Sequence, residues 1–325
     1  MKKSKERGRN FFVPDIYTAN LAFFGTICYN KCICYKYIEE ADKMRLIDCH
    51  THTQYSMDSE ADIREMINRA IELELAAYAI TDHCECNCWY PKEHYEDTSL
   101  SDYFGYKDDF EASVAAITAL KEEYGSRLNL LCGTEMGQAT QAPEIAALIN
   151  ADSRLDLVIG SLHQIRNEQD FFYIDYSKMS DGEINDLLER YFKEIYELCC
   201  MNCFDILGHL TYCTRYMNVR NKIDPDLTPF DEIIAESLRT LARNGKGIEI
   251  NTSGLRKQTG VTYPTLKYVK MFRDLGGEII SVGSDGHKVR DLGAGIAEGA
   301  EIAQAAGFRD LCYFKNRKPQ FIRIV

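Results

Sequence analysis

The chain has 325 residues, of which 45% are hydrophobic and 27% charged, so it is long enough to bury a full core. Its formal net charge of −12 argues against nonspecific binding of nucleic acid, which needs clustered Lys and Arg, and favours a small substrate. No segment of the sequence approaches the roughly 20 consecutive apolar residues of a membrane-spanning helix. Thirteen cysteines at irregular positions predict a reduced, cytoplasmic protein.

Residues 1–43 differ from the rest of the chain. They combine a basic start with many aromatic residues and have neither helical nor strand periodicity. Because Met44 stands directly before the first convincing strand, we expect native translation to begin there and 1–43 to be an N-terminal extension, non-native or poorly ordered. The alternative is a genuine extension that packs on the main domain. Cys28, Cys32 and Cys34 match no standard zinc motif, which disfavours a separate metal site.

From Met44 onward, short apolar runs alternate with longer amphipathic segments, as in strands that lead into helices and return to a parallel sheet. The predicted strands are 46–49, 77–81, 128–132, 157–160, 206–208, 247–250 and 279–282. The predicted helices include 61–75, 110–123, 181–200, 229–244, 263–275 and 291–306. Seven such units, with no linker or short repeat within 44–325, predict one α/β domain folded as a closed barrel.

Six of the seven histidines come directly after predicted strands. The C-terminal ends of the strands in a parallel barrel meet on one face, so residues far apart in sequence can build a single site there. The set consists of His50 and His52 after the first strand, Asp82 and His83 after the second, Glu135 after the third, His163 after the fourth, His209 after the fifth, and Asp285 and His287 after the seventh. His94, in a polar loop, is the exception.

This combination of side chains predicts metal binding. Imidazoles and carboxylates together suit zinc, manganese or iron, whereas an all-oxygen set would indicate magnesium or calcium. His50 and His52 lie two apart on an extended segment, so both can face one ion. A single histidine at a strand end is more often a hydrogen-bonded structural residue than a ligand. Independent structural histidines would have no reason to gather at the same end of five strands, so the joint pattern predicts several divalent ions.

The same residues carry a resemblance to a known family. Over residues 44–325 the chain resembles the PHP (polymerase and histidinol phosphatase) superfamily, and within it the monofunctional histidinol-phosphatases. The shared motifs are Asp48-Cys49-His50-Thr51-His52, Thr81-Asp82-His83, Gly160-Ser161-Leu162-His163, Gly208-His209-Leu210 and Gly283-Ser284-Asp285-Gly286-His287. The stretch from Glu249 to Lys257 is similar to the histidinol-phosphatase branch in particular.

The resemblance implies a distorted seven-stranded (β/α)7 TIM-like barrel with two or three divalent metal ions, Zn, Mn or Fe. The implied ligands are His50, His52, Glu135 and Asp285 for one ion, Glu135 again with His163 and His209 for a second, and His83 and His287 for a third. Some relatives supply a further histidine to the third ion where this chain has Asp58. A carboxylate can still ligate, so Asp58 is predicted as a ligand, with capping of the following helix as the alternative.

The resemblance also implies an activity. The protein would be a metal-dependent phosphomonoesterase, a histidinol-phosphatase that converts L-histidinol phosphate to L-histidinol and phosphate in histidine biosynthesis. A hydroxide bridging two metal ions would attack phosphorus in line. Asp285 and His287 are the candidates for protonating the departing alkoxide, although metal ligation alone would explain both residues.

The substrate phosphate is expected to meet guanidinium groups, whose planar fork can donate to two oxygens at once. The candidates are Arg256, Arg166 and Arg215, each a few residues beyond a predicted strand, and Asn251 is expected to orient the same loop as Arg256. An ordinary surface ion pair is the alternative for each arginine.

Two other functions stay open. One is a PHP phosphoesterase acting on nucleotide or oligonucleotide phosphates, which the acidity disfavours, and the other is a noncatalytic metal-binding PHP module. Cys84, Cys86 and Cys88 could suggest a thiolate metal site or a nucleophile, but no second cysteine pair accompanies them, so we interpret them as loop cysteines near the site. The sequence predicts no oligomeric state.

Overall fold

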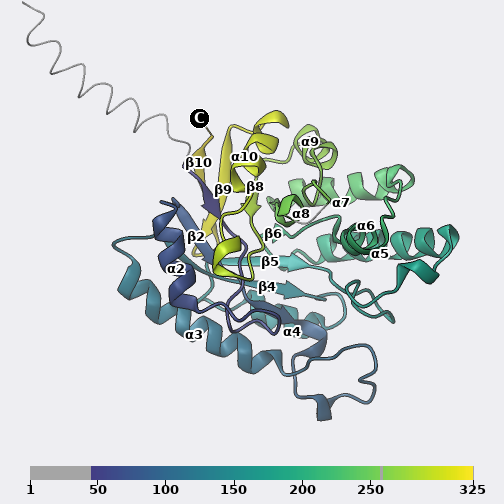
Figure 1. Cartoon of the computed structure of the whole chain (residues 1–325), viewed down its shortest axis with the longest axis horizontal. Helices are drawn as coiled ribbons and strands as arrows, with labels where there is room; N and C mark the ends of the chain where they lie inside the picture. Colours follow the sequence, from purple (N-terminus) through teal and green to yellow (C-terminus); the bar gives the residue numbers. More distant parts are fainter. Residues whose placement is uncertain (1–44, 257–258, 325) are drawn as a thin grey trace, which may run out of the picture. The chain divides into compact units, whose positions relative to one another are not determined.

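Parallel strands form the centre of the protein, and helices lie outside them (Figure 1). The computed structural model describes residues 45–256 and 259–324, so the expectations for 1–43 lie outside the described residues. Residues Arg45–Ile324 form one compact unit. Seven strands follow one another around the sheet: β1 (Ile47–Asp48), β2 (Ala77–Ile80), β4 (Leu130–Gly137), β5 (Leu157–Ser161), β6 (Ile206–Leu207), β7 (Gly247–Asn251) and β8 (Ile280–Gly283).

The sheet nearly closes on itself, because the segment after β1 meets the end of β8 and the residues that follow it. The Cys49 amide donates to the Val282 carbonyl at 3.0 Å, and the Asp285 amide donates to the His50 carbonyl at 2.8 Å. All neighbouring strands within the sheet are parallel. The predicted (β/α)7 barrel is therefore confirmed, and the C-terminal ends of its strands share one rim.

The helices begin where the sequence supplies capping groups. Asp62 accepts hydrogen bonds from the amides of Arg64 and Glu65 at the start of α2, and Ser180 with Glu183 forms a capping box at the start of α5. The helices are α2 (Ile63–Glu72), α3 (Tyr106–Tyr124), α4 (Pro143–Asn150), α5 (Asp181–Met201), α6 (Arg215–Asn221), α7 (Asp231–Arg243), α8 (Ser253–Arg256), α9 (Leu266–Asp274) and α10 (Ile296–Ala305). Within the described ranges, no helix is long and apolar enough to cross a bilayer.

Strand β4 is longer than the sequence predicts. We expected it to end at residue 132, with Glu135 after it, but it continues to Gly137. A short strand, β3 (His83–Glu85), pairs with its second half on one side, and β5 pairs with it on the other. Glu135 therefore lies inside a paired strand rather than after it, which fixes its backbone firmly.

A hairpin of β9 (Asp310–Lys315) and β10 (Lys318–Arg323) follows the barrel. The basic residues 315–318 form the turn at its tip, with Asn316 and Arg317 at positive φ. The Arg317 side chain, however, is an ion-pair partner rather than a purely exposed group. Its Nε lies 2.6 Å from an oxygen of the buried Asp205, directly before β6.

We expect Arg317→Ala to lower the free energy of unfolding by about 3 kcal/mol, because the carboxylate of Asp205 would stay buried without its main partner. The control is Arg323→Ala, which breaks the more exposed pair with Asp310 and is expected to cost less than about 1 kcal/mol. Urea unfolding followed by circular dichroism measures both. Equal losses of unfolding free energy in the two variants would show that the ion pair of Arg317 does not anchor the hairpin.

Candidate metal centre

Glu135 lies at the centre of the rim, and its two carboxylate oxygens face different histidines. Oε1 is 3.0 Å from Nε2 of His163 and 2.7 Å from Nε2 of His209. Oε2 is 3.2 Å from Nε2 of His50 and 3.0 Å from Nδ1 of His83. One carboxylate from β4 thus joins imidazoles that follow β1, β2, β5 and β6, an arrangement suited to bridging two cations.

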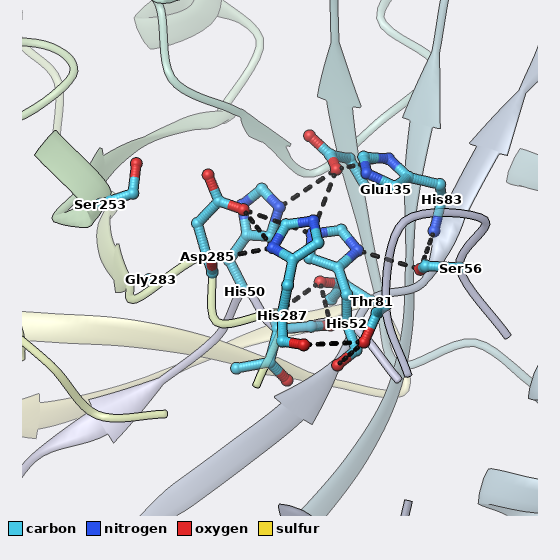
Figure 2. Close-up of polar contacts among 12 residues, drawn as sticks. His50, His52, Ser56, Thr81, His83, Glu135, Ser253, Gly283, Asp285 and His287 are labelled. Carbon is cyan, nitrogen blue, oxygen red and sulfur yellow. Dashed lines mark hydrogen bonds and ion pairs between the residues drawn. The ribbon is translucent and has the colours of Figure 1, made fainter. Parts of the chain in front are cut away.

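Asp285 is the second carboxylate of the site. Its Oδ1 lies 3.5 Å from Nε2 of His52 and 3.4 Å from Nδ1 of His287. Figure 2 shows the rings of His50, His52 and His287 between the carboxylates of Glu135 and Asp285, with the His83 ring on the other side of Glu135. Asp285 has a φ of 54°, a left-handed conformation that aspartate tolerates better than most residues.

Asp58 lies at the outer edge of the cluster. Its carboxylate is 3.0 Å from Nε2 of His287 and 3.6 Å from Nε2 of His83, so it lies between the two imidazoles of the implied third site. The alternative role as a helix cap is wrong, because α2 begins at Ile63 and Asp62 caps it. The structure brings all nine sequence-predicted metal ligands to one place.

Among residues 45–256 and 259–324, four groups of three donor atoms lie close enough to hold a metal ion. The groups are His50 with His52 and Glu135, Glu135 with His163 and His209, His52 with His83 and His287, and His83 with Glu85 and His163. Nε2 of His50, Nε2 of His52 and Nδ1 of His83 are buried and lie 3.0 to 3.5 Å from carboxylate oxygens, but none of the three makes a well-aligned hydrogen bond within the described part of the chain. Buried imidazole nitrogens and carboxylate oxygens that converge without hydrogen bonds between them are costly unless a further group binds them, so this donor set fits divalent metal ions.

The electrostatics of the protein residues favour an ionised Glu135. Burial alone would raise its pKa, but the neighbouring imidazoles of His50, His163 and His83 outweigh burial and hold the pKa well below its ordinary value. Burial and the nearby rings of His287 and His83 lower the pKa of His52 well below its ordinary value, so His52 is neutral. Burial would also lower the pKa of His50, His83 and His163, but the neighbouring carboxylates raise it above the ordinary value. Metal ligation requires an ionised carboxylate and neutral imidazoles, so a bound cation would displace protons from these three rings.

Two further glutamates, not predicted from the sequence as site residues, orient the imidazole rings of the metal centre. Oε1 of Glu249 lies 2.8 Å from Nδ1 of His50, and its Oε2 accepts the amide of His209 at 2.9 Å. Oε1 of Glu85 lies 3.0 Å from Nδ1 of His163. Both fix ring orientation, as carboxylates behind metal-bound histidines do. The sequence offered one indication of this role for Glu249, which is a charged residue within the otherwise apolar run of β7.

We expect Glu249→Gln to weaken zinc binding by about tenfold to a hundredfold, because His50 and the His209 backbone would lose a charged partner. Zinc affinity measured by competition with a chromogenic chelator tests this. The matched control is Glu189→Gln on the exposed face of α5, which pairs only with Lys193 among the described side chains. Identical affinity in the two variants would contradict a supporting role for Glu249.

Asp82 and Asp48 shape the loops that carry the ligands. Asp82 accepts hydrogen bonds from the amide of Thr53 at 2.6 Å and from the hydroxyls of Ser56 and Ser113 at 2.9 and 2.7 Å. Ser56 in turn lies 3.1 Å from Nδ1 of His52. Asp48 accepts the amides of Ser284 and Gly293, each at 2.9 Å. These acids hold the first and last ligand loops against each other rather than facing the cation cluster.

The three arginines predicted to bind phosphate lie in different surroundings. Arg215 is buried and donates to Oδ2 of Asp285 at 2.7 Å, to Ser253 and to Asn251, whose amide also reaches Asp285. Arg256 donates to the backbone carbonyls of Ser284 and Asp285. Both line the cavity above the metal centre.

Arg166 is not part of this site. Its guanidinium forms a two-pronged ion pair with Glu197 at 2.7 Å and donates to the Thr140 carbonyl at 2.6 Å. It does not line the cavity that holds the metal centre. Arg166 was predicted to lie near the rim because it follows a strand end by only a few residues. That separation along the chain does not determine the direction in which the side chain points.

The cavity above the metal centre has a volume of about 550 Å³, within the usual range for small-molecule sites. Its walls combine the metal cluster with aromatic side chains, Phe172, Tyr173, Tyr212 and Tyr216.

The cysteines after His83 are buried, and burial raises the pKa of the Cys84 and Cys86 thiols well above the ordinary value. Such thiols are poor nucleophiles, which agrees with their interpretation as structural neighbours of the site.

Comparisons with known proteins find relatives that match most of this chain. The histidinol-phosphatase of Lactococcus lactis subsp. lactis is 28% identical over 290 residues, covering 85% of this chain and 96% of the relative. That of Bacillus subtilis is 24% identical over 274 residues, covering 77% and 96%. A crystal structure of histidinol phosphate phosphatase from Lactococcus lactis, complexed with zinc, L-histidinol and phosphate, has a TM-score of 0.65 at 24% identity and covers 85% of this chain and 99% of that one.

The solved structure establishes a shared fold. A model of the PHP domain matches residues 48–253, well over half of the chain, and includes the ligand positions from His50 to His209. The chain therefore belongs to the PHP domain family.

Proposed function

We propose that this protein is a metal-dependent phosphomonoesterase that hydrolyses L-histidinol phosphate to L-histidinol and phosphate, a step of histidine biosynthesis. The observation that carries the proposal is Glu135, a buried carboxylate whose two oxygens face separate sets of imidazoles at the floor of a substrate-sized cavity. This chain covers nearly the whole length of the relatives named histidinol-phosphatase. Their name supports the choice of substrate.

Bound divalent ions would supply the nucleophile and offset charge on the phosphoryl oxygens, which a phosphate monoester needs because its uncatalysed hydrolysis is among the slowest known. The chain's own residues position these parts. Glu135 lies between two pairs of imidazoles, His163 with His209 and His50 with His83. Arg215 holds Asp285 in place through a 2.7 Å ion pair.

Asp285 and His287 both line the cavity. Burial would raise the pKa of Asp285, but Arg215 and the neighbouring imidazoles hold it well below the ordinary value, so Asp285 carries no proton to donate and would orient a water instead. His287 is then the residue that would pass a proton toward the departing oxygen.

Arg256 is the candidate for direct phosphate binding. It is only partly buried and lines the cavity, and Lys288 adds positive charge to the same wall. Its contacts to the carbonyls of Ser284 and Asp285 hold the guanidinium beside the ligand loop. A guanidinium placed there can donate to phosphoryl oxygens while it keeps part of its backbone contact.

We expect Arg256→Ala to lower kcat/KM by about a hundredfold, because it removes a charged hydrogen-bond donor from the substrate phosphate. Arg166→Ala is the matched control, since it deletes the same side chain from the pair with Glu197 outside the cavity. Steady-state phosphate release from L-histidinol phosphate measures both. Equal kinetics in the two variants would remove Arg256 from the phosphate site.

The test of the proposed function is a three-substrate assay. Protein loaded with zinc or manganese is offered L-histidinol phosphate, a nucleoside monophosphate and a short oligonucleotide, and phosphate release is followed. We expect a clear preference for L-histidinol phosphate. Preference for either nucleotide substrate would support a nucleic-acid-directed phosphoesterase instead, and release from none would favour a noncatalytic metal-binding module.

We also place the protein in the cytoplasm. Each of the ten cysteines in the described part of the chain is a free thiol, which is typical of a reducing compartment. Small-molecule biosynthesis fits that location.

A further inference from the structure

The outer ring nitrogen of His52 faces a hydroxyl group, whereas that of His50 faces a carboxylate. Nδ1 of His50 lies 2.8 Å from Oε1 of Glu249, and Nδ1 of His52 lies 3.1 Å from Oγ of Ser56. A carboxylate accepts hydrogen bonds, but a hydroxyl can either donate or accept. The contact between Ser56 and His52 therefore does not by itself show which of the two atoms carries the proton.

The Ser56 oxygen makes three polar contacts, which together decide this point. Besides Nδ1 of His52, it accepts the backbone amide of His83 at 3.0 Å and lies 2.9 Å from Oδ1 of Asp82. Figure 2 shows the contacts of Ser56 with His52 and His83. A hydroxyl has one proton and two lone pairs. The His83 amide occupies one lone pair, so one proton and one lone pair remain for Asp82 and His52.

Only one placement of the protons makes all three contacts hydrogen bonds. Asp82 accepts the amide of Thr53 at 2.6 Å, the Thr53 hydroxyl at 2.9 Å and the hydroxyl of Ser113 at 2.7 Å, so its carboxyl group acts as an acceptor. The Ser56 proton then points to Asp82, and the second lone pair of Ser56 accepts Nδ1–H of His52. If Ser56 donated to His52 instead, two oxygen atoms would lie 2.9 Å apart with no proton between them.

The inner nitrogen of His52 would otherwise attract the same proton. Nε2 lies 3.5 Å from Oε2 of Glu135 and 3.5 Å from Oδ1 of Asp285. A neutral imidazole carries a single ring proton, and a proton on Nε2 would occupy the lone pair that a cation needs. The position of that proton therefore decides whether His52 can bind a metal ion between the two carboxylates.

We propose that Asp82 and Ser56 together hold the ring proton of His52 on Nδ1 and so keep Nε2 free for a divalent cation. Both are positioning residues, because they act through the ring of His52. The hydrogen bonds link the loop after β1, which carries His52 and Ser56, to Asp82 after β2 and to Ser113 on α3. The inference concerns metal binding and does not depend on the proposed phosphatase function.

Nuclear magnetic resonance reads the position of the proton directly. The full-length chain is labelled with an NMR-active nitrogen isotope and stripped of metal, and long-range proton–nitrogen correlation spectra show which nitrogen of each imidazole is protonated. The chain has seven histidines, so the signals are few, and the spectrum of His52→Gln identifies those of His52. We expect the proton on Nδ1 in wild type and on Nε2, facing the two carboxylates, in Ser56→Ala.

Ser113→Ala is the matched control. It also removes a hydroxyl that donates to Asp82, but that hydroxyl belongs to α3 and makes its printed contact with Asp82 alone. The loss of one donor to Asp82 is therefore the same in the two variants, and only Ser56→Ala changes the surroundings of the His52 ring. We expect Ser113→Ala to keep the His52 proton on Nδ1.

Competition with a chromogenic chelator gives the zinc affinity of the same proteins. We expect Ser56→Ala to bind zinc about tenfold or more weakly than wild type, because the tautomer with a free Nε2 is no longer favoured, and Ser113→Ala to bind it nearly as wild type does. Circular dichroism compares the folds. A His52 proton on Nε2 in metal-free wild type would overturn the inference, and this spectrum decides even if Ser56→Ala does not fold. The same tautomer and zinc affinity in wild type and Ser56→Ala would overturn it too. Neither measurement uses substrate, so a failure of the proposed function would leave both results standing.

Discussion

Glu135→Gln is expected to lower the turnover of L-histidinol phosphate by about a thousandfold. The reason is that an amide, unlike a carboxylate, cannot offer one charged oxygen to each of two metal ions. In the structure one oxygen faces His163 and His209, and the other faces His50 and His83. The substitution removes the negative charge that these four imidazoles share. We therefore also expect the purified variant to carry less zinc than the wild type.

Steady-state kinetics and elemental analysis of the same sample measure both effects. The variant is nearly isosteric, so its circular dichroism spectrum is expected to match that of wild type. Glu189→Gln again serves as the control, with unchanged turnover and metal content. Turnover within about tenfold of wild type, at full zinc content, would be incompatible with a bridging role for Glu135.

Removal of metal is expected to abolish turnover completely and reversibly. Dialysis against a chelator should reduce phosphate release to background, and added zinc or manganese should restore it. Metal that binds only the folded protein stabilises it, by about 2.7 kcal/mol at a concentration one hundred times the Kd. We therefore expect the chelated protein to melt about 5 °C or more below the loaded protein.

Differential scanning calorimetry with and without chelator gives the melting temperatures, and the activity of each sample is measured in parallel. Unchanged activity after complete metal removal would contradict the proposed function. An unchanged Tm with lost activity would instead indicate that the unfolded chain binds the ions as tightly as the native site does.

The supporting glutamates and the arginines mark the limit of inference from sequence. Glu249 lies within an apolar strand and Glu85 within a short strand that was not predicted, so neither stands out as a strand-end residue. Arg166 and Arg215 both follow strand ends, yet one pairs with Glu197 outside the cavity and the other with Asp285 inside it. Distance along the chain does not fix the direction in which a long side chain points.

The sequence by itself determined the seven βα units and the set of histidines and acids that follow their strands. It could do so because strand and helix periodicities are local, and because every parallel strand of a barrel ends on the same rim. Only the tertiary structure decided which oxygen of Glu135 faces which imidazoles, that Asp58 lies between His83 and His287, and that Glu249 and Glu85 hold the rings of His50 and His163. Those features depend on side-chain directions and on contacts between distant segments, which are set when the closed barrel packs.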